Sequence, residues 1–235
     1  MRARPWLSSG SEVGLRSHHP LPKRQAKLRP SALSDLLQIS QAELSQMRHH
    51  GTGPQYFHEA RRVHYREGDV INFVNLAVRS TRDQTAAPFD RIPGPLMMAA
   101  ECGELLNVSP GALGQMRSQN AGPRFLKFGR RVRYAVEDVA DFVLMNRDTP
   151  PRMGQRRRGR KEWTPSVNRG TRLMTLAELA AAMSLSRKGL YSLRADQRGP
   201  HSIRVGSVLR FHPDDVERWI RASTFDQSSL GSGWS

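Results

Sequence analysis

The chain has 235 residues and a formal net charge of +16 at pH 7, from 37 Lys and Arg against 21 Asp and Glu. Such a charge implies a polyanionic partner, nucleic acid first and an anionic membrane surface second, or else a surface that is basic only for solubility. No stretch approaches the ~18 apolar residues that span a bilayer. The basic N-terminus lacks the apolar core of a secretory signal. A single cysteine excludes an internal disulfide framework and favours a reducing cytoplasm.

Residues 1–29 are predicted to form a disordered basic arm, because cations, Pro, Ser and Gly are frequent there and apolar periodicity is absent. The arm either follows a phosphate backbone or enters a minor groove, as homeodomain arms do, or is a solvated tail.

The rest of the chain contains one pattern three times. Aligning Gly53-Pro54, Gly122-Pro123 and Gly199-Pro200 needs no gap. Inward positions then agree, with Leu44, Leu113 and Leu190 in one column and Tyr65, Tyr134 and Phe211 in another. Because chance does not produce such a register over most of a chain, we interpret it as an internal repeat. The predicted modules are residues 30–78, 96–146 and 173–222.

The third module shows the expected elements best. Thr175 and Glu178 form a capping box for a first helix, and Ser186 caps a second. Short alternating strands flank Gly206-Ser207, which predicts a hairpin, and Pro213 begins a closing helix. The fold class is therefore mainly α with small β-hairpin wings (α+β).

Residues 173–221 also resemble a known family. Three strings carry the resemblance: S-R-K-G-L-Y-S-L-R at 186–194, G-P at 199–200 and D-D-V-E-R-W-I at 214–220, with a basic hairpin between the last two. They are similar to the small winged helix-turn-helix of excisionases and AlpA-type phage regulators, which are relatives of the MerR DNA-binding domain. The resemblance implies a DNA-binding protein of bacteria, phages or mobile elements, here with three tandem copies.

The second helix of each module is expected to read base edges with the face opposite its inward leucine. The candidates are Lys188, Tyr191 and Ser192 in module three, Gln115 and Ser118 in module two, and Gln46 and His49 in module one. Arginines beside them suit phosphates, namely Arg187, Arg194, Arg117 and Arg48. Outward residues differ between modules, as expected for different subsites; unconstrained drift on a solvent face is the alternative.

The hairpin wings are expected to place cations against phosphates or in a narrow minor groove, unless they are only solvated edges. The candidates are Lys127, Arg130, Arg131 and Arg133 in module two, Arg61 and Arg62 in module one, and Arg204 and Arg210 in module three.

Two basic linkers, 79–95 and 147–172, are predicted to be disordered and to let modules occupy neighbouring turns of one duplex. The second contains a tether for non-specific phosphate affinity, made of Arg156, Arg157, Arg158, Arg160 and Lys161. Residues 223–235 are a Ser/Gly-rich tail.

Module one differs from the others. Pro30 predicts a short first helix, and Glu43 makes its second helix the least basic, which favours weak DNA binding or a protein contact. His49-His50 lacks partners at metal-ligand spacing. Cys102, aligned with Leu33 and Leu179, is expected in the core.

No phosphate-cradling loop, metal-ligand cluster or nucleophile elbow is present, so neither catalysis nor a cofactor is expected. We expect a sequence-specific double-stranded DNA-binding protein of the cytoplasm and nucleoid that regulates transcription and contacts RNA polymerase. One alternative is an excisionase that bends an attachment site for an integrase or other recombinase. Others are a partner-binding scaffold and RNA binding through the tether. A monomer with internal repeats and head-to-tail assembly on DNA both stay open.

Overall fold

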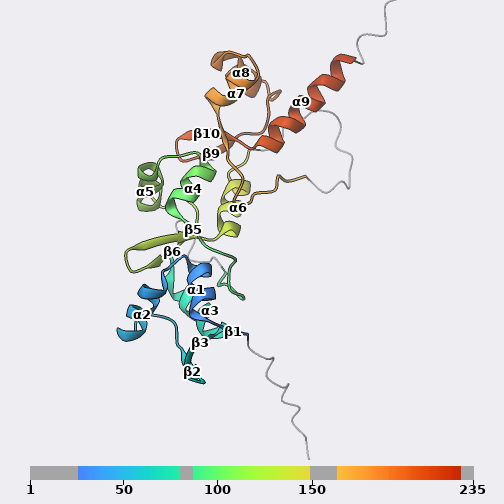
Figure 1. Ribbon diagram of the computed structural model, residues 1–235. Helices are drawn as coiled ribbons and strands as arrows, with labels where there is room; N and C mark the ends of the chain where they lie inside the picture. The colour runs from blue at the N-terminus through green and yellow to red at the C-terminus, as the bar shows by residue number, and fades with distance from the viewer. Residues whose placement is uncertain (1–25, 80–86, 149–162, 229–235) are drawn as a thin grey trace, which may run out of the picture.

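The computed structural model describes residues 26–79, 87–148 and 163–228, and side chains as far as residue 223. Within these ranges the fold is α+β, with short helices and three small antiparallel sheets. We call the three ranges units one, two and three. Each contains the order helix, helix, strand, strand, helix, and the units are stacked end to end as a column, from the first (blue) to the third (orange to red) (Figure 1).

Unit one has a three-stranded sheet in the order β1-β3-β2. Its elements are β1 (Lys27–Leu28), α1 (Pro30–Leu37), α2 (Gln41–His49), β2 (Phe57–Glu59), β3 (Arg62–Arg66), α3 (Glu67–Ala77) and β4 (Val78–Arg79). The first helix is as long as its counterpart in unit two, so the expectation of a short helix is wrong. Pro30 occupies its first turn, where no backbone N–H is needed.

Unit two has a sheet in the order β4-β6-β7-β5, whose outer strand β4 comes from the end of unit one. Its elements are β5 (Met97–Met98), α4 (Ala99–Leu106), α5 (Pro110–Ser118), β6 (Phe125–Phe128), β7 (Arg131–Tyr134) and α6 (Val136–Met145).

Unit three has a sheet in the order β8-β10-β9. Its elements are β8 (Met174–Thr175), α7 (Leu176–Ala182), α8 (Arg187–Ala195), β9 (Ile203–Val205), β10 (Val208–Phe211) and α9 (Pro213–Ser228). No helix in the described ranges is both long enough and apolar enough to cross a membrane.

Local signals in the sequence account for the helix starts. The hydroxyls of Ser40, Ser109 and Ser186 cap α2, α5 and α8 by accepting backbone N–H groups of those helices. Thr175 and Glu178 form the predicted capping box on α7. Pro213 begins α9 as predicted.

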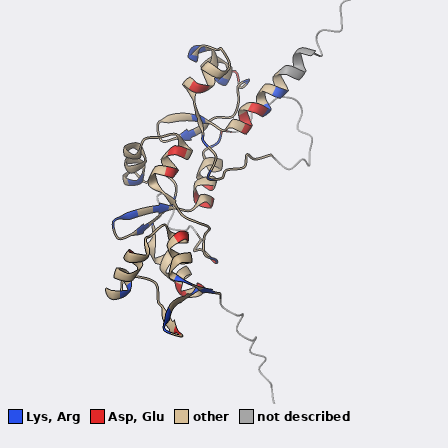
Figure 2. Cartoon of the chain, in the orientation of Figure 1, with Lys and Arg blue, Asp and Glu red and all other residues tan. Residues whose placement is uncertain are grey.

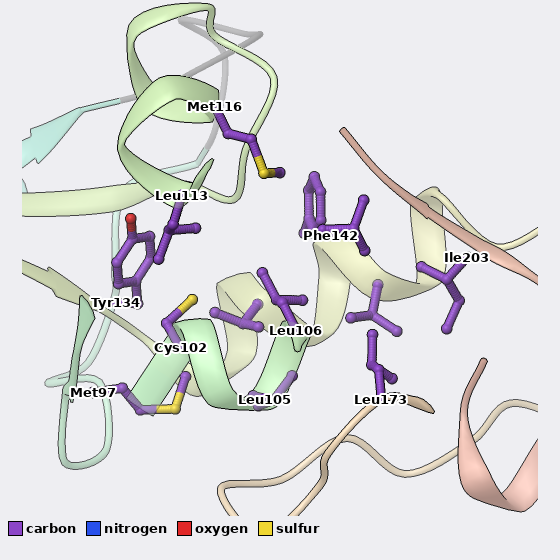
Figure 3. Packing of buried hydrophobic residues seen from close by; sticks show 13 residues of the cluster. Met97, Cys102, Leu105, Leu106, Leu113, Met116, Tyr134, Phe142, Leu173 and Ile203 are labelled. Atoms are coloured by element: carbon purple, nitrogen blue, oxygen red, sulfur yellow. The ribbon is translucent and has the colours of Figure 1, made fainter. Parts of the chain in front are cut away.

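Two of the three hydrophobic clusters in the described residues cross a unit boundary. One cluster joins Leu37 and Val74 of unit one with Leu126 and Phe128 of unit two. A second joins Leu106 and Phe142 of unit two with Leu173 and Ile203 of unit three, whose side chains point toward each other in Figure 3. A third, smaller cluster lies within unit three. Each junction is therefore part of a core.

This packing corrects the picture of freely tethered modules. The Asn75 side chain accepts from Phe89 N–H (2.8 Å) and donates to Phe89 O (3.0 Å), which fixes the first linker to α3. In the second linker, Arg169 Nη2 donates to Leu96 O at 2.6 Å. Apolar linker side chains such as Phe89 and Ile92 pack on the core despite the Pro and Gly around them. The end of the predicted disordered arm is ordered, because Lys27–Leu28 form β1 and pair with β3. Residues 1–25 of the arm and the tether, Arg156, Arg157, Arg158, Arg160 and Lys161, lie outside the described residues.

Candidate nucleic-acid interface

The helices α2, α5 and α8 each bury one face and expose the other. Leu44, Leu113 and Leu190 are buried, as their spacing predicts. The predicted base-reading side chains are all exposed, namely Gln46, His49, Gln115, Ser118, Lys188, Tyr191 and Ser192. Arg187 is exposed at the start of α8. Each helix thus presents a different polar face to solvent, and its contact with DNA stays a prediction.

Three arginines predicted for phosphates have partners within the protein. Arg48 Nη1 donates to the Tyr65 hydroxyl at 2.6 Å, and Arg117 Nη1 donates to the Tyr134 hydroxyl at 2.8 Å. These bonds tie each second helix to the hairpin of its own unit. Burial, partly offset by Arg117, raises the pKa of Tyr134 to about 12, so this hydroxyl stays protonated at neutral pH.

Unit three has Phe211 where the other units have tyrosine. Without a hydroxyl there, Arg194 Nε donates instead to Ser202 Oγ at 3.0 Å and lies 3.9 Å from Asp148 of unit two. The three arginines therefore brace the helix against the hairpin, which corrects their assignment as free phosphate contacts.

The two-stranded hairpins carry exposed cations, and we number them one (β2–β3), two (β6–β7) and three (β9–β10). The exposed members of the predicted set are Arg61, Arg62, Lys127, Arg130, Arg131 and Arg204. Figure 2 shows their blue segments on the hairpins between the helices. Gly129 and Gly206 have positive φ at the hairpin turns, a conformation that glycine adopts without strain. The turns thus bring cationic side chains to the surface beside α2 and α5.

Arg133 and Arg210 are not available to DNA, which corrects the prediction for these two residues. Arg133 is only 6% exposed, and its Nε and Nη2 both donate to the carbonyl of Gln38 in unit one. Arg210, half-buried, makes the same paired contact with the carbonyl of Asn107 in unit two. Both arginines lie on inner strands of their sheets, β7 and β10, and their side chains reach the preceding unit.

Glu43 is also engaged within the protein. Its Oε1 accepts from Arg131 Nε of hairpin two, and its Oε2 accepts from Ser40 Oγ at 3.1 Å. Desolvation opposes ionisation, but the bonds from Arg131 and Ser40 outweigh it and lower the pKa of Glu43. Glu43 therefore joins units one and two. Because this acidic residue was the feature that favoured a protein partner for module one, that argument no longer holds.

Histidine and cysteine show no sign of metal chemistry in the described ranges. No group of three or more His, Cys, Asp or Glu side chains there is arranged to hold a metal ion. His49 and His50 lie edge to face with their ring centroids 5.2 Å apart. Cys102 is fully buried as predicted, and burial raises the pKa of its thiol to about 12, so it is unreactive.

One comparison with known proteins finds a family match within unit three. A family model described as a helix-turn-helix domain matches residues 173–224, which include α7 and α8 and lie within unit three. No curated protein and no solved structure matches the chain. The match supports DNA binding through a helix-turn-helix in unit three.

Proposed function

We propose that this chain is a sequence-specific double-stranded DNA-binding protein in which all three units are winged helix-turn-helix modules, and that it regulates transcription without catalysis. The observation that carries the proposal is the repeated surface: a capped second helix with an exposed polar face, flanked by a cationic hairpin, in each unit. Unit three supplies the family match. Helix faces select bases while hairpin cations and Arg187 bind phosphates.

The different helix faces indicate different subsites. Gln115 in unit two can hold adenine through two hydrogen bonds, whereas Lys188 in unit three suits the guanine O6 and N7 acceptors. Tyr191, 52% exposed, adds an aromatic surface beside Lys188. A composite site with at least two distinct base preferences is therefore expected.

Selection from a random duplex pool at near-physiological salt tests the proposal with the full chain. A long motif is expected, in which Gln115→Ala relaxes one subsite and Lys188→Ala another. Met145→Ala, at a position 83% exposed on α6, is the matched control and leaves the motif unchanged. If no motif emerges and binding depends steeply on salt, or if RNA competes as well as the duplex, sequence-specific DNA binding is overturned.

An excisionase is the second candidate, favoured by the stacking of the units. A column whose units share cores can impose its own shape on DNA, and bending an attachment site is how such a protein directs an integrase. Bending of the selected site, together with recruitment of a recombinase, would support this role. A straight site at a promoter, with RNA polymerase recruited or excluded, would support regulation.

A further inference from the structure

The two junctions between units are built from equivalent residues of the repeat. Leu96 N–H donates to Leu36 O at 2.8 Å where unit two meets unit one, and Leu173 N–H donates to Leu105 O at 2.9 Å where unit three meets unit two. In the repeat, Leu96 corresponds to Leu173 and Leu36 to Leu105. Each unit therefore begins by bonding to the first helix of the unit before it.

The arginine contacts repeat in the same way. Arg133 binds the carbonyl of Gln38, and Arg210 that of Asn107. Gln38 and Asn107 are equivalent C-cap residues with left-handed φ values of 53° and 52°. This conformation turns the helix end so that its carbonyl meets the next unit, and the guanidinium fixes the orientation with two donors.

The chain leaving each closing helix pairs with the next hairpin. Val78 pairs with Leu126 in an antiparallel ladder, and the equivalent Arg147 forms an antiparallel bridge with Ile203. Asp148 N–H then donates to Ser202 O at 2.9 Å. Main-chain bonds thus set the spacing of the units at both junctions, together with the shared cores.

Hairpins two and three lie against the second helix of the preceding unit. Arg131 of hairpin two forms an ion pair with Glu43 of α2. A Cβ on Gly206 of hairpin three would lie 3.6 Å from the Met116 side chain of α5. Along the column of Figure 1, the surface elements accordingly follow the order α2, hairpin two, α5, hairpin three, α8.

We propose that the three units form a ruler of fixed register, which binds one uninterrupted DNA site whose subsite spacing is set by the junctions. This rests on the proposed function. Hairpins two and three would contact DNA between two second helices, so the boundary between subsites falls on a hairpin. Tethered modules would accept variable spacers, whereas this arrangement accepts one spacing.

Unit one is built as the end of the ruler. At the positions of Leu96 and Leu173 it has Lys27, which pairs at 2.6 Å with Glu59, the equivalent of Phe128 and Val205. Arg66 lies 4.6 Å from the ring centroid of Phe57 on the same surface. Charged residues thus replace the apolar junction, as in the capping repeats of solenoids. A further copy does not extend the array here, so the site is finite.

The first test inserts base pairs between subsites of the selected sequence. We expect that one, five or ten added base pairs weaken binding about tenfold or more, because one unit loses its subsite while the others hold theirs (a 1.4 kcal/mol loss is tenfold). A ten-base-pair insert restores the helical face but not the distance, so it does not rescue affinity. Retained affinity with that insert overturns the ruler while leaving DNA binding intact.

The second test needs no DNA and stands if no motif is found. Spin labels on Leu76→Cys in α3 and Glu217→Cys in α9, both exposed positions, report the distance from unit one to unit three. Native Cys102 does not interfere, since it is buried. A single narrow distance distribution in the full chain supports the ruler, and a broad distribution overturns it. Circular dichroism of the labelled protein confirms the fold.

Discussion

The two junctions share one backbone geometry but differ in the side chains that complete it. Between units one and two, the rings of Phe73 and Phe128 stack with centroids 5.2 Å apart. Between units two and three, Arg147 forms a two-bond ion pair with Asp215, at 2.6 and 2.9 Å, with side chains 8% and 0% exposed. Both junctions have an apolar core, and the second junction adds a buried charge pair to it.

The difference shows which part of a junction defines its geometry. Val78 stands at the position of Arg147, and Asp138, the equivalent of Asp215, turns to Arg124 of its own unit at 2.8 Å. The side-chain chemistry has thus been exchanged, while the bonds to main-chain carbonyls are the same. Main-chain acceptors do not depend on residue identity, so the arrangement tolerates different side chains around them.

The largest loss in the free energy of unfolding is expected from a change at the buried ion pair between Arg147 and Asp215. Asp215→Ala leaves the Arg147 guanidinium buried without its partner, and removal of one member of such a pair costs about 3–5 kcal/mol. Urea unfolding of the full chain measures this loss. The double variant Arg147→Met, Asp215→Leu is expected to recover much of it, because no charge is left uncompensated. A single variant as stable as the parent would contradict the assignment of this pair to the junction.

The arginine at the other junction comes next. Arg133→Met removes two donors from the Gln38 carbonyl, and a buried acceptor left unpaired costs about 1–3 kcal/mol. Burial, the largest cause, lowers the pKa of Arg133, although neighbouring glutamates oppose the shift. Arg130→Met, at an exposed position of the same hairpin, is the control and should leave stability unchanged while weakening DNA binding. If Arg133→Met instead weakened DNA binding and left stability unchanged, Arg133 would be a DNA contact.

A smaller loss in the free energy of unfolding is expected at Tyr134, the position at which unit three has Phe211. Tyr134→Phe reproduces the side chain of Phe211 and removes the acceptor for Arg117, which costs about 0.5–1.5 kcal/mol. The cost is measured by urea unfolding. Phe211→Tyr is the converse variant, and it should gain little, because Arg194 is already held by Ser202. A large gain would show that Arg194 is free to exchange partners.

Much of each unit follows from its sequence, whereas the contacts between units do not. Ser40, Ser109 and Ser186 cap their helices because a hydroxyl before an apolar repeat is a local signal. The hairpin around Gly206 and the burial of Cys102 were equally predictable. The exposed faces of α5 and α8 follow from the opposite leucines.

The roles of Arg133 and Arg210 could not be predicted by the same reasoning. A cation in a hairpin with alternating apolar residues is expected to face solvent. The acceptors of Arg133 and Arg210 are main-chain carbonyls, which every residue type has, so the sequence does not indicate them. Gln38, Asn107 and Ser184 share the left-handed conformation but not a side chain. The one signal was the repeat itself, in which arginine recurs at this position in units two and three and His64 replaces it in unit one.

The smallest effect is expected from Glu178, which belongs to both a cap and a junction. Its Oε2 accepts from Thr175 N–H at 2.7 Å and from Asn107 Nδ2 of unit two at 3.0 Å, and Arg172 donates to Oε1 at 2.8 Å. The bond from the Thr175 backbone, followed by that from Arg172, lowers the pKa of Glu178 from 4.5 to about 2. Because the pKa is lower in the folded state, the stabilisation is present above pH 4.5 and is lost as the pH falls toward 2.

Comparing the parent with Glu178→Gln between pH 7 and pH 2 isolates this contribution. The parent should be more stable at pH 7 by less than about 1 kcal/mol, since the carboxylate is partly solvated, and the difference should vanish near pH 2. Glu137→Gln, at an exposed position on α6, is the control and should run parallel to the parent. A difference that persists at pH 2 would mean that Glu178 acts through its shape and neutral hydrogen bonds and not through its charge.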